Sequence, residues 1–390
     1  QTVGEIQLPL SNCGVVSLDY ENYNGIATSI GHSPISGLID PSIGSINSIG
    51  ESLTNIIWAP LENGIKSISL SANWMWPCGN EGEDSRLYKA VNACSNFAIE
   101  LGINIPTGKD SLSMVQKYDN IKIKSPGTVI ISASGHCQDI RKVVKPVLNK
   151  KIGDLYYIDL SFDELRLGGS SFAQTQNKIG NDAPTIKNSV KFRDAFNLVQ
   201  DLIKSNKIKS GHDISSGGMI TTLLEMCFSS VNTGMDINLT ELGCDDNTKL
   251  FFSENQGLII QSELNLENNF SKIGVDCHKI GKINNVGLLN IKNFEDNFSF
   301  NIAEYRDIWY STSKDFDKIQ TKNNKGVERF NNYKNQPLNF IFPDDFHGNV
   351  DRDFDKNKIN AAVIREKGSN SEREMADMMS IAGFNVKDIH

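Results

Sequence analysis

The sequence lacks the features that commit a chain to a membrane, an oxidising compartment or a nucleic acid. No apolar run approaches the roughly 20 residues of a membrane-spanning helix, and runs such as 361–364 have the length of a strand. The seven cysteines are odd in number and form no CxxC pair, as is typical of reduced intracellular thiols. The 39 Lys and Arg against 47 Asp and Glu give a net charge of −8, without the dense basic face that nucleic acids and anionic membranes attract. We therefore expect a soluble, cytoplasmic protein that binds neither.

The start of the chain also lacks an initiator Met and a basic-then-apolar signal peptide. Residues 1–4 therefore indicate the middle of a longer chain. The length of 390 residues exceeds that of one ordinary hydrophobic core, so we expect at least two domains.

The first region, 1–140, mixes helical and strand patterns. The spacing of apolar residues predicts helices over 45–59 and 83–101, and Gly102 is placed to end the second. Short β-rich runs lie around 65–70 and 128–133. This mixture predicts an α/β or α+β domain.

A basic, proline-containing stretch, 141–151, marks the first expected boundary. Beyond it a strand over 155–160 and helices over 190–204 and 218–228 predict a second α/β domain, 150–312. Residues 313–358 are rich in Asn, Lys and Asp, so we expect a linker that wraps a surface or stays mobile.

The last segment, 359–390, has the pattern of a strand (361–364), a helix (371–382) and the start of another strand (385–386). Ser371 and Glu374 have the spacing of a capping box. So short a unit cannot bury a core of its own, which predicts the beginning of a third domain.

The common nucleotide and catalytic motifs are missing. Residues 102–111 resemble a P-loop, but five residues separate the glycines where four are required, and Asp110 stands where Ser or Thr should bind the metal. The sequence has no GxGxxG, HExxH or GxSxG motif, and its six histidines lack zinc-ligand spacing.

Two local patterns retain chemical interest. Glu51 and Asn55 lie four residues apart, so they share one helix face with Asn47 and offer the hard oxygen ligands that Mg²⁺ prefers. From spacing alone, an ordinary solvated face is the favoured interpretation. Residues 211–218 place Asp213 and Ser215 before a helix N-terminus, where a ligand loop and a plain cap are equally good interpretations.

Two glycine-rich stretches are weaker candidates. Residues 167–174 form a glycine-serine turn before a short helix, and Lys109 lies in a Gly-flanked stretch that we expect to be a tight loop. Such a Lys is usually solvated, although it can act as a point charge for phosphate.

Together these stretches resemble one family, the large phosphoribosylformylglycinamidine synthases of purine biosynthesis. The resemblance covers almost the whole chain in family order, and it rests on the stretches 70–75 (LSANWM), 81–91 (EGEDSRLYKAV), 105–114 (IPTGKDSLSM), 212–218 (HDISSGG), 362–370 (AVIREKGSN) and 372–376 (EREMA).

The resemblance implies an ATP-dependent C–N ligase that converts formylglycinamide ribonucleotide into its amidine with ammonia from glutamine. It implies two core halves, each with the aminoimidazole ribonucleotide synthetase-like fold, in which an N-terminal barrel-forming sheet precedes a C-terminal α/β sandwich. One half carries the working ATP site and the other a structural ADP with magnesium. This chain resembles the second half followed by the start, residues 359–390, of a class I glutaminase domain.

The resemblance also implies site residues. Glu51, Asn55 and Asp213 match the metal ligands, and Ser215 matches a nucleotide contact. A further metal ligand, an Asp in the family, falls on Asn12, and the adjacent nucleotide contact falls on Ser11. Asn12, and Ser216 where Asp is common, depart from the pattern, and fewer carboxylates weaken cation binding. The implied cofactors are ATP or ADP and Mg²⁺, with Lys109 as the candidate phosphate contact named above.

No catalytic residue can be assigned, because none of the seven cysteines has the Gly-x-Cys-x-Gly context of the glutaminase nucleophile. The isolated chain is therefore expected to be inactive. Its expected partners are the nucleotide and phosphoribosyl substrate, the first synthetase half, the rest of the glutaminase domain and, in their absence, a second copy of the chain.

Two other interpretations stay open. One is a non-catalytic scaffold that ADP stabilises by ligand linkage. The other is a stand-alone relative such as selenophosphate synthetase or thiamine-monophosphate kinase, which share an Asp-x-Ser-x-Gly-Gly loop. The stretches 71–75 and 108–111 and the tail disfavour the latter.

Overall fold

A computed structural model describes residues 6–19, 21–150, 153–335, 338–339, 341–345 and 359–390. The chain divides into two compact units, residues 1–339 and 340–390, and each is described by itself. All seven cysteines are free. Among the described residues, no helix is both long and apolar enough to span a bilayer.

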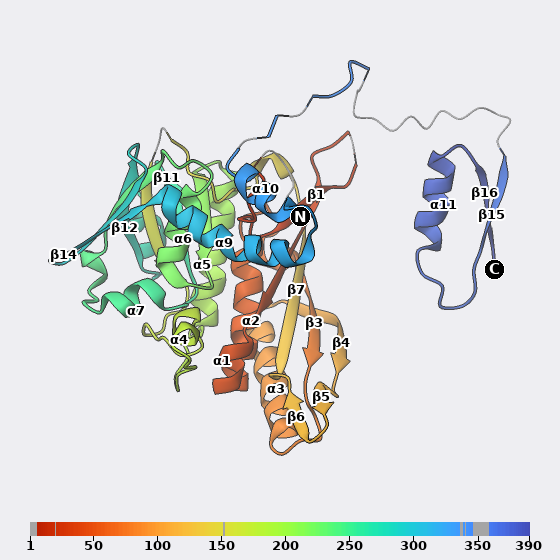
Figure 1. The fold of residues 1–390 in the computed structure, drawn as a ribbon, viewed down its shortest axis with the longest axis horizontal. Helices are drawn as coiled ribbons and strands as arrows, with labels where there is room; N and C mark the ends of the chain where they lie inside the picture. Colours follow the sequence, from red (N-terminus) through yellow and green to blue (C-terminus); the bar gives the residue numbers. More distant parts are fainter. Residues whose placement is uncertain (1–5, 20, 151–152, 336–337, 340, 346–358) are drawn as a thin grey trace. The chain divides into compact units, whose positions relative to one another are not determined.

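The first part of unit 1 is built on a five-stranded sheet (Figure 1). Its strands, in spatial order, are β1 (Gly14–Ser17), β2 (Gly25–His32), β7 (Thr128–Cys137), β3 (Ile68–Met75) and β4 (Asn104–Ser111). Neighbours pair antiparallel except β3 and β4, which run parallel. A separate hairpin is formed by β5 (Val115–Tyr118) and β6 (Ile121–Lys124).

Capping residues, acidic first turns and a left-handed glycine set the ends of the helices in this part. Helix α1 (Pro34–Ile39) leads into α2 (Pro41–Ile56), whose Asp40 cap accepts a hydrogen bond from Ser42 N at 2.7 Å. Helix α3 (Glu83–Leu101) begins with two acidic residues and ends at Gly102, which has a left-handed conformation. The helices predicted over 45–59 and 83–101 are thereby confirmed.

The two faces of the first sheet differ in exposure. Along β2 the side chains alternate between buried and exposed, as a half-buried strand requires. Helix α2 packs on the buried face (Figure 1). On the other face Thr28, Ile30 and His32 are exposed, so the sheet is open in this chain.

The second part of unit 1 is built on a seven-stranded sheet. Its strands, in spatial order, are β14 (Asp296–Asn301), β13 (Leu288–Asn293), β10 (Gly234–Asn238), β12 (Cys277–Asn284), β8 (Asp154–Asp159), β11 (Gly257–Ser262) and β9 (Ile208–Ile214). Its longer helices are α5 (Ser189–Lys204) and α6 (Gly218–Cys227), and its short ones are α4 (Ser171–Thr175), α7 (Asn247–Phe252) and α8 (Glu267–Ser271). Single 3-10 turns cover Gly64–Ser67, Ile140–Lys142 and Thr240–Leu242.

One hydrophobic core runs through both parts of unit 1. It joins α2 and the first sheet to α5 and one face of the second sheet, and a second core lies under α6 and α9. At Gly211 on β9 a Cβ atom would come within 2.0 Å of the Trp58 ring, so only glycine fits this contact. The two parts expected as separate domains therefore share a core.

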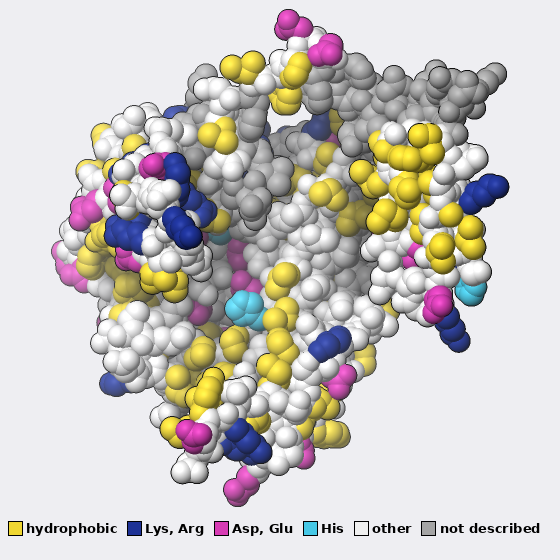
Figure 2. Space-filling view, turned by 45° about the vertical axis from the view of Figure 1, so that its right-hand side comes forward, with side chains coloured by type: hydrophobic (Ala, Val, Ile, Leu, Met, Phe, Trp, Pro, Cys, Tyr) yellow, Lys and Arg dark blue, Asp and Glu magenta, His cyan; other side chains and the backbone are white. Residues whose placement is uncertain are grey.

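On the face drawn in Figure 2, Lys and Arg side chains lie in separate groups rather than in one basic stripe.

Part of the expected linker, 313–358, is helical. Helix α9 spans Ile302–Gln320, and α10 spans Lys325–Asn332. The buried rings of Tyr310 and Tyr333 stack with their centroids 4.0 Å apart, which fixes α10 against α9. Sparse aromatic residues supply the packing that a search for regular apolar spacing overlooks. Residues 336–337, 340 and 346–358 of the expected linker lie outside the described residues.

Unit 2 contains the predicted strand-helix-strand order. Strands β15 (Asn360–Ile364) and β16 (Asn385–Ile389) pair in parallel, with α11 (Glu372–Ile381) between them in sequence. The predicted capping box is wrong, because Ser371 has a left-handed backbone (φ 63°) and its side chain makes no cap hydrogen bond. In that conformation its hydroxyl does not reach the free NH groups of the first turn.

Candidate functional site

The structure brings together the residues of α2 and of the β9–α6 turn that sequence analysis singled out. Glu51 Oε1 accepts hydrogen bonds from Ser215 Oγ at 2.8 Å and from Asn55 Nδ2 at 3.4 Å. Ser215 follows the end of β9, and Glu51 lies in the middle of α2. The contact therefore joins two segments that are 164 residues apart in sequence.

Asp213 is the most enclosed member of this group. It is 1% exposed, near the end of β9, and its Oδ1 lies 3.3 Å from His212 Nδ1. Its other oxygen, Oδ2, has no hydrogen-bond partner. A buried carboxylate oxygen without a donor is costly unless a cation or a polar ligand satisfies it.

Titration of the group reflects this crowding of acidic side chains. Burial, with added repulsion from Asp213 and Glu254, raises the pKa of Glu51 to about 8. Burial opposes the charged form of His212, but hydrogen bonds to Asp213 and Glu225 outweigh it and raise the pKa of His212 to about 9. The crowding thus favours the protonated forms of both Glu51 and His212, a balance that a divalent cation would change.

The N-terminal segment reaches the same region. Asn12 is half-buried and its Nδ2 lacks a partner, whereas Ser11 is exposed. The neighbouring Cys13 has a pKa raised to about 12 by burial and by the nearby Cys137 and Asp213, which places this segment within electrostatic reach of Asp213.

Glu254 is a member of the site that sequence analysis missed. It precedes β11, and its Oε1 accepts hydrogen bonds from two backbone groups, Ser171 N at 2.7 Å and Gly217 N at 2.8 Å. These belong to the glycine-serine turns that precede α4 and α6. One carboxylate thereby fixes both turns, and only the fold reveals the pairing because the residues are far apart in sequence.

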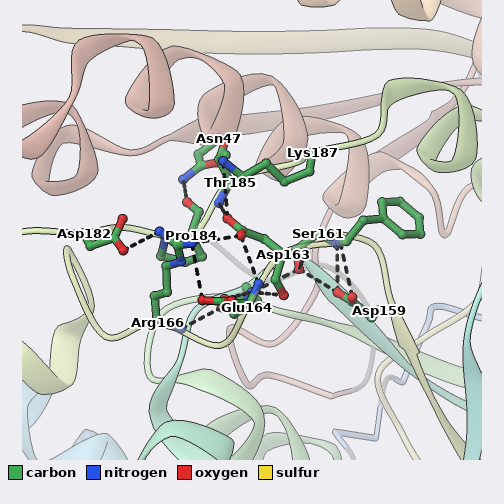
Figure 3. Close-up of polar contacts among 12 residues, drawn as sticks. Asn47, Asp159, Ser161, Asp163, Glu164, Arg166, Asp182, Pro184, Thr185 and Lys187 are labelled. Carbon is green, nitrogen blue, oxygen red and sulfur yellow. Dashed lines mark hydrogen bonds and ion pairs between the residues drawn. The ribbon is translucent and has the colours of Figure 1, made fainter.

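The solvated helix face that spacing favoured for α2 is wrong. Helix α2 is enclosed on most sides, and Asn47 is 6% exposed. Asn47 does not join Glu51: its Nδ2 donates to Pro184 O at 2.8 Å (Figure 3). Figure 3 places it at the edge of a polar network in which Arg166 pairs with Asp163 and Asp182. This network fixes the loop between β8 and α5.

Lys109 lies in a different environment from the one expected. The stretch 108–111 is part of strand β4, not a tight loop, and its residues pair with Ala72–Met75 of β3. Lys109 is exposed, and its Nζ is hydrogen-bonded to Ser111 Oγ. Its role as a phosphate contact therefore stays a prediction.

The donor set fits a hard cation better than a soft one. Within the described residues, no group of three or more His, Cys, Asp or Glu side chains is arranged to hold a metal ion. The candidate ligands are two carboxylates, Glu51 and Asp213, and two amides, Asn55 and Asn12. The free Asp213 Oδ2 supplies one ready oxygen. Because amide orientation is assigned rather than observed, either atom of the Asn12 amide can face the site. Oxygen ligands of this kind suit Mg²⁺.

Two family models match the chain. Residues 1–136 match the FGAR-AT PurM N-like domain, and residues 155–292 match the C-terminal domain of AIR synthase related proteins. Over its full length the chain is 38% identical to a probable phosphoribosylformylglycinamidine synthase of Arabidopsis thaliana and 31% identical to the human phosphoribosylformylglycinamidine synthase. The whole chain is similar to these enzymes. It spans 28% of the plant relative and 30% of the human one.

Solved structures show the same fold. PurL of Thermotoga maritima complexed with FGAR matches with a TM-score of 0.59 at 12% identity, over 76% of this chain and 48% of that one. The same protein complexed with ADP matches with a TM-score of 0.57 at 11% identity, over 95% of this chain and 52% of that one. The expected aminoimidazole ribonucleotide synthetase-like fold is thereby confirmed.

Proposed function

We propose that this chain is the second synthetase half of a phosphoribosylformylglycinamidine synthase, followed by the first part of its glutaminase domain. The full-length similarity to the plant and human enzymes supports this assignment. The β15–α11–β16 order of unit 2 agrees with the opening of an α/β domain. The parent enzyme would be an ATP- and glutamine-dependent C–N ligase acting on formylglycinamide ribonucleotide.

The site of this half would bind ADP or ATP with Mg²⁺. Glu51, Asp213, Asn55 and Asn12 would hold the cation, which would neutralise the nucleotide's phosphates. The observation that carries the proposal is the buried Asp213 Oδ2 without a partner, in the same acidic group as Glu51. Ser215 and the exposed Ser11 would contact the nucleotide, and Lys109 remains a candidate phosphate contact.

The open face of the first sheet would pack against the other synthetase half. Exposed Ile30 lies on this face and Val16 lies on the edge strand β1, and a covering sheet would bury such side chains. In the isolated chain a second copy would take this place. Unit 2 would be completed by the rest of the glutaminase domain.

The isolated chain would be inactive in the parent reaction. It contains a site for one nucleotide and no assigned glutaminase nucleophile. We expect no turnover in an assay with ATP, glutamine and the ribonucleotide above that of an Asp213→Ala control; turnover above that background would refute this.

We place the protein in the cytoplasm, although the name of the plant relative gives chloroplast or mitochondrion.

Mass spectrometry of nucleotide released on denaturation tests the proposal. We expect ADP in the purified chain, or a rise in melting temperature when ADP and Mg²⁺ are added together. An empty protein that neither ligand stabilises would contradict it. If ADP proves to be a permanent, non-exchanging component, the chain acts as a nucleotide-stabilised scaffold.

A further inference from the structure

A chain of hydrogen bonds connects the candidate site to helix α9. His212 Nδ1 lies 3.3 Å from Asp213 Oδ1, and His212 Nε2 lies 2.9 Å from Glu225 Oε2. The other oxygen of Glu225 accepts from Trp309 Nε1 at 2.9 Å. The chain therefore runs from Asp213 on β9 through Glu225 on α6 to Trp309 on α9.

The geometry gives each member a fixed orientation. His212 is 6% exposed, and both its ring nitrogens are engaged, so the ring cannot turn without breaking a contact. Thr222 Oγ1, three residues before Glu225 on α6, also donates to the backbone oxygen of Asp213 at 3.0 Å. Helix α6 thus restrains Asp213 at its backbone directly and at its side chain through His212.

We propose that Glu225 and His212 are positioning residues that aim the free Oδ2 of Asp213 at the bound cation, with Trp309 anchoring Glu225. This inference rests on the proposed function and extends it to residues that touch neither ligand. A ligating carboxylate whose second oxygen is held by a hydrogen bond loses less freedom when it binds a metal. The orientation of α9 then contributes to cation affinity.

The test measures Mn²⁺ affinity of the 390-residue chain by electron paramagnetic resonance of the free ion. Glu225→Ala should weaken Mn²⁺ binding by about tenfold or more, the range for lost outer-shell partners. Glu225→Gln should restore most of the affinity, because its amide oxygen can accept from Trp309 and its NH₂ group can donate to Nε2 of a neutral His212, whose Nδ1–H still donates to Asp213. Trp309→Phe should fall between wild type and Glu225→Ala. Glu241→Ala, an exposed glutamate, is the matched control.

Circular dichroism and urea unfolding of each variant separate positioning from loss of fold. Unchanged affinity in a folded Glu225→Ala protein would overturn the inference while leaving the proposed site intact. Glu225→Gln binding as weakly as Glu225→Ala would also overturn it, since charge rather than hydrogen bonding would then be responsible. A wild-type chain that binds no Mn²⁺ would refute the proposed site, and the inference with it. If Glu225→Ala alters folding, Trp309→Phe with intact fold and unchanged affinity would count against it.

Discussion

Two stretches with similar residues, 211–218 and 108–111, lie in opposite environments. Each contains glycine, serine and an aspartate. Asp213 is 1% exposed and lies at the junction of α2, β9 and α6, whereas Asp110 is exposed on strand β4. The difference shows that composition alone does not define a ligand site. What distinguishes 211–218 is that buried acceptors and backbone donors from distant segments converge on it.

The largest expected difference is in the stability lost when alanine replaces Gly218 or Gly102. Gly218 and Gly102 both have φ of +74°, but a Cβ at Gly218 would lie 2.4 Å from Phe251 O, whereas a Cβ at Gly102 would meet nothing within 4 Å. Gly218→Ala should therefore reduce the free energy of unfolding by more than about 2 kcal/mol, and Gly102→Ala by about 1 kcal/mol. Urea denaturation measures both. Equal losses would show that the 211–218 turn tolerates a side chain.

The next difference concerns the two aspartates. Asp213→Asn should weaken the apparent affinity for Mg²⁺ at least about tenfold, because it removes a buried charge next to the proposed cation. Asp110→Asn should leave it unchanged. Thermal unfolding across a Mg²⁺ titration in the presence of ADP measures the effect, and matching behaviour of the two variants would abolish the distinction between the stretches.

A loss of stability is also expected at Glu254, which joins the 211–218 turn to the start of α4. Glu254→Ala leaves Ser171 N and Gly217 N without their acceptor, so we expect a loss of about 1–3 kcal/mol in unfolding free energy. Faster amide exchange at both residues should accompany it. Glu263→Ala, which removes a surface carboxylate 4.0 Å from Lys209, is the control. Faster exchange at only one of the two residues would contradict the inference that Glu254 holds both segments.

The smallest effect is expected at Lys109. Because its side chain is exposed on β4, Lys109→Ala should change the free energy of unfolding by less than about 0.5 kcal/mol. Chemical denaturation measures this value. If Lys109→Ala strongly weakens ADP binding, Lys109 gains support as a phosphate contact. The stretch 108–111 would then also belong to a ligand site, as 211–218 is proposed to.

The sequence predicted those parts of the fold that depend on local patterns. Helices α2, α3, α5 and α6 follow from apolar spacing, and Gly102 ends α3 as expected. The burial of α2 on most sides did not follow, since its many serines resemble a polar surface until strands β2 and β7 of the first sheet cover them. Nor did α10, which depends on the stacking of Tyr333 on Tyr310.

The candidate site was predicted in part. Spacing paired Glu51 with Asn55 and, separately, placed Asp213 and Ser215 before a helix N-terminus. The family resemblance joined the two patterns into one site, and the structure places these residues together. Glu254, Glu225 and Trp309 carried no sequence pattern, because their partners lie on other elements. Contacts between elements distant in sequence are a property of the tertiary fold, so residues of this kind escape motif analysis.

Calorimetric titration of ADP into the chain, with and without Mg²⁺, tests the central claim most directly. For wild type and Asp110→Asn, each first freed of bound nucleotide, we predict binding that Mg²⁺ strengthens, and for Asp213→Ala we predict the loss of that strengthening. Binding that is indifferent to Mg²⁺, or equal in wild type and Asp213→Ala, would contradict the assignment of Glu51 and Asp213 to a nucleotide-cation site.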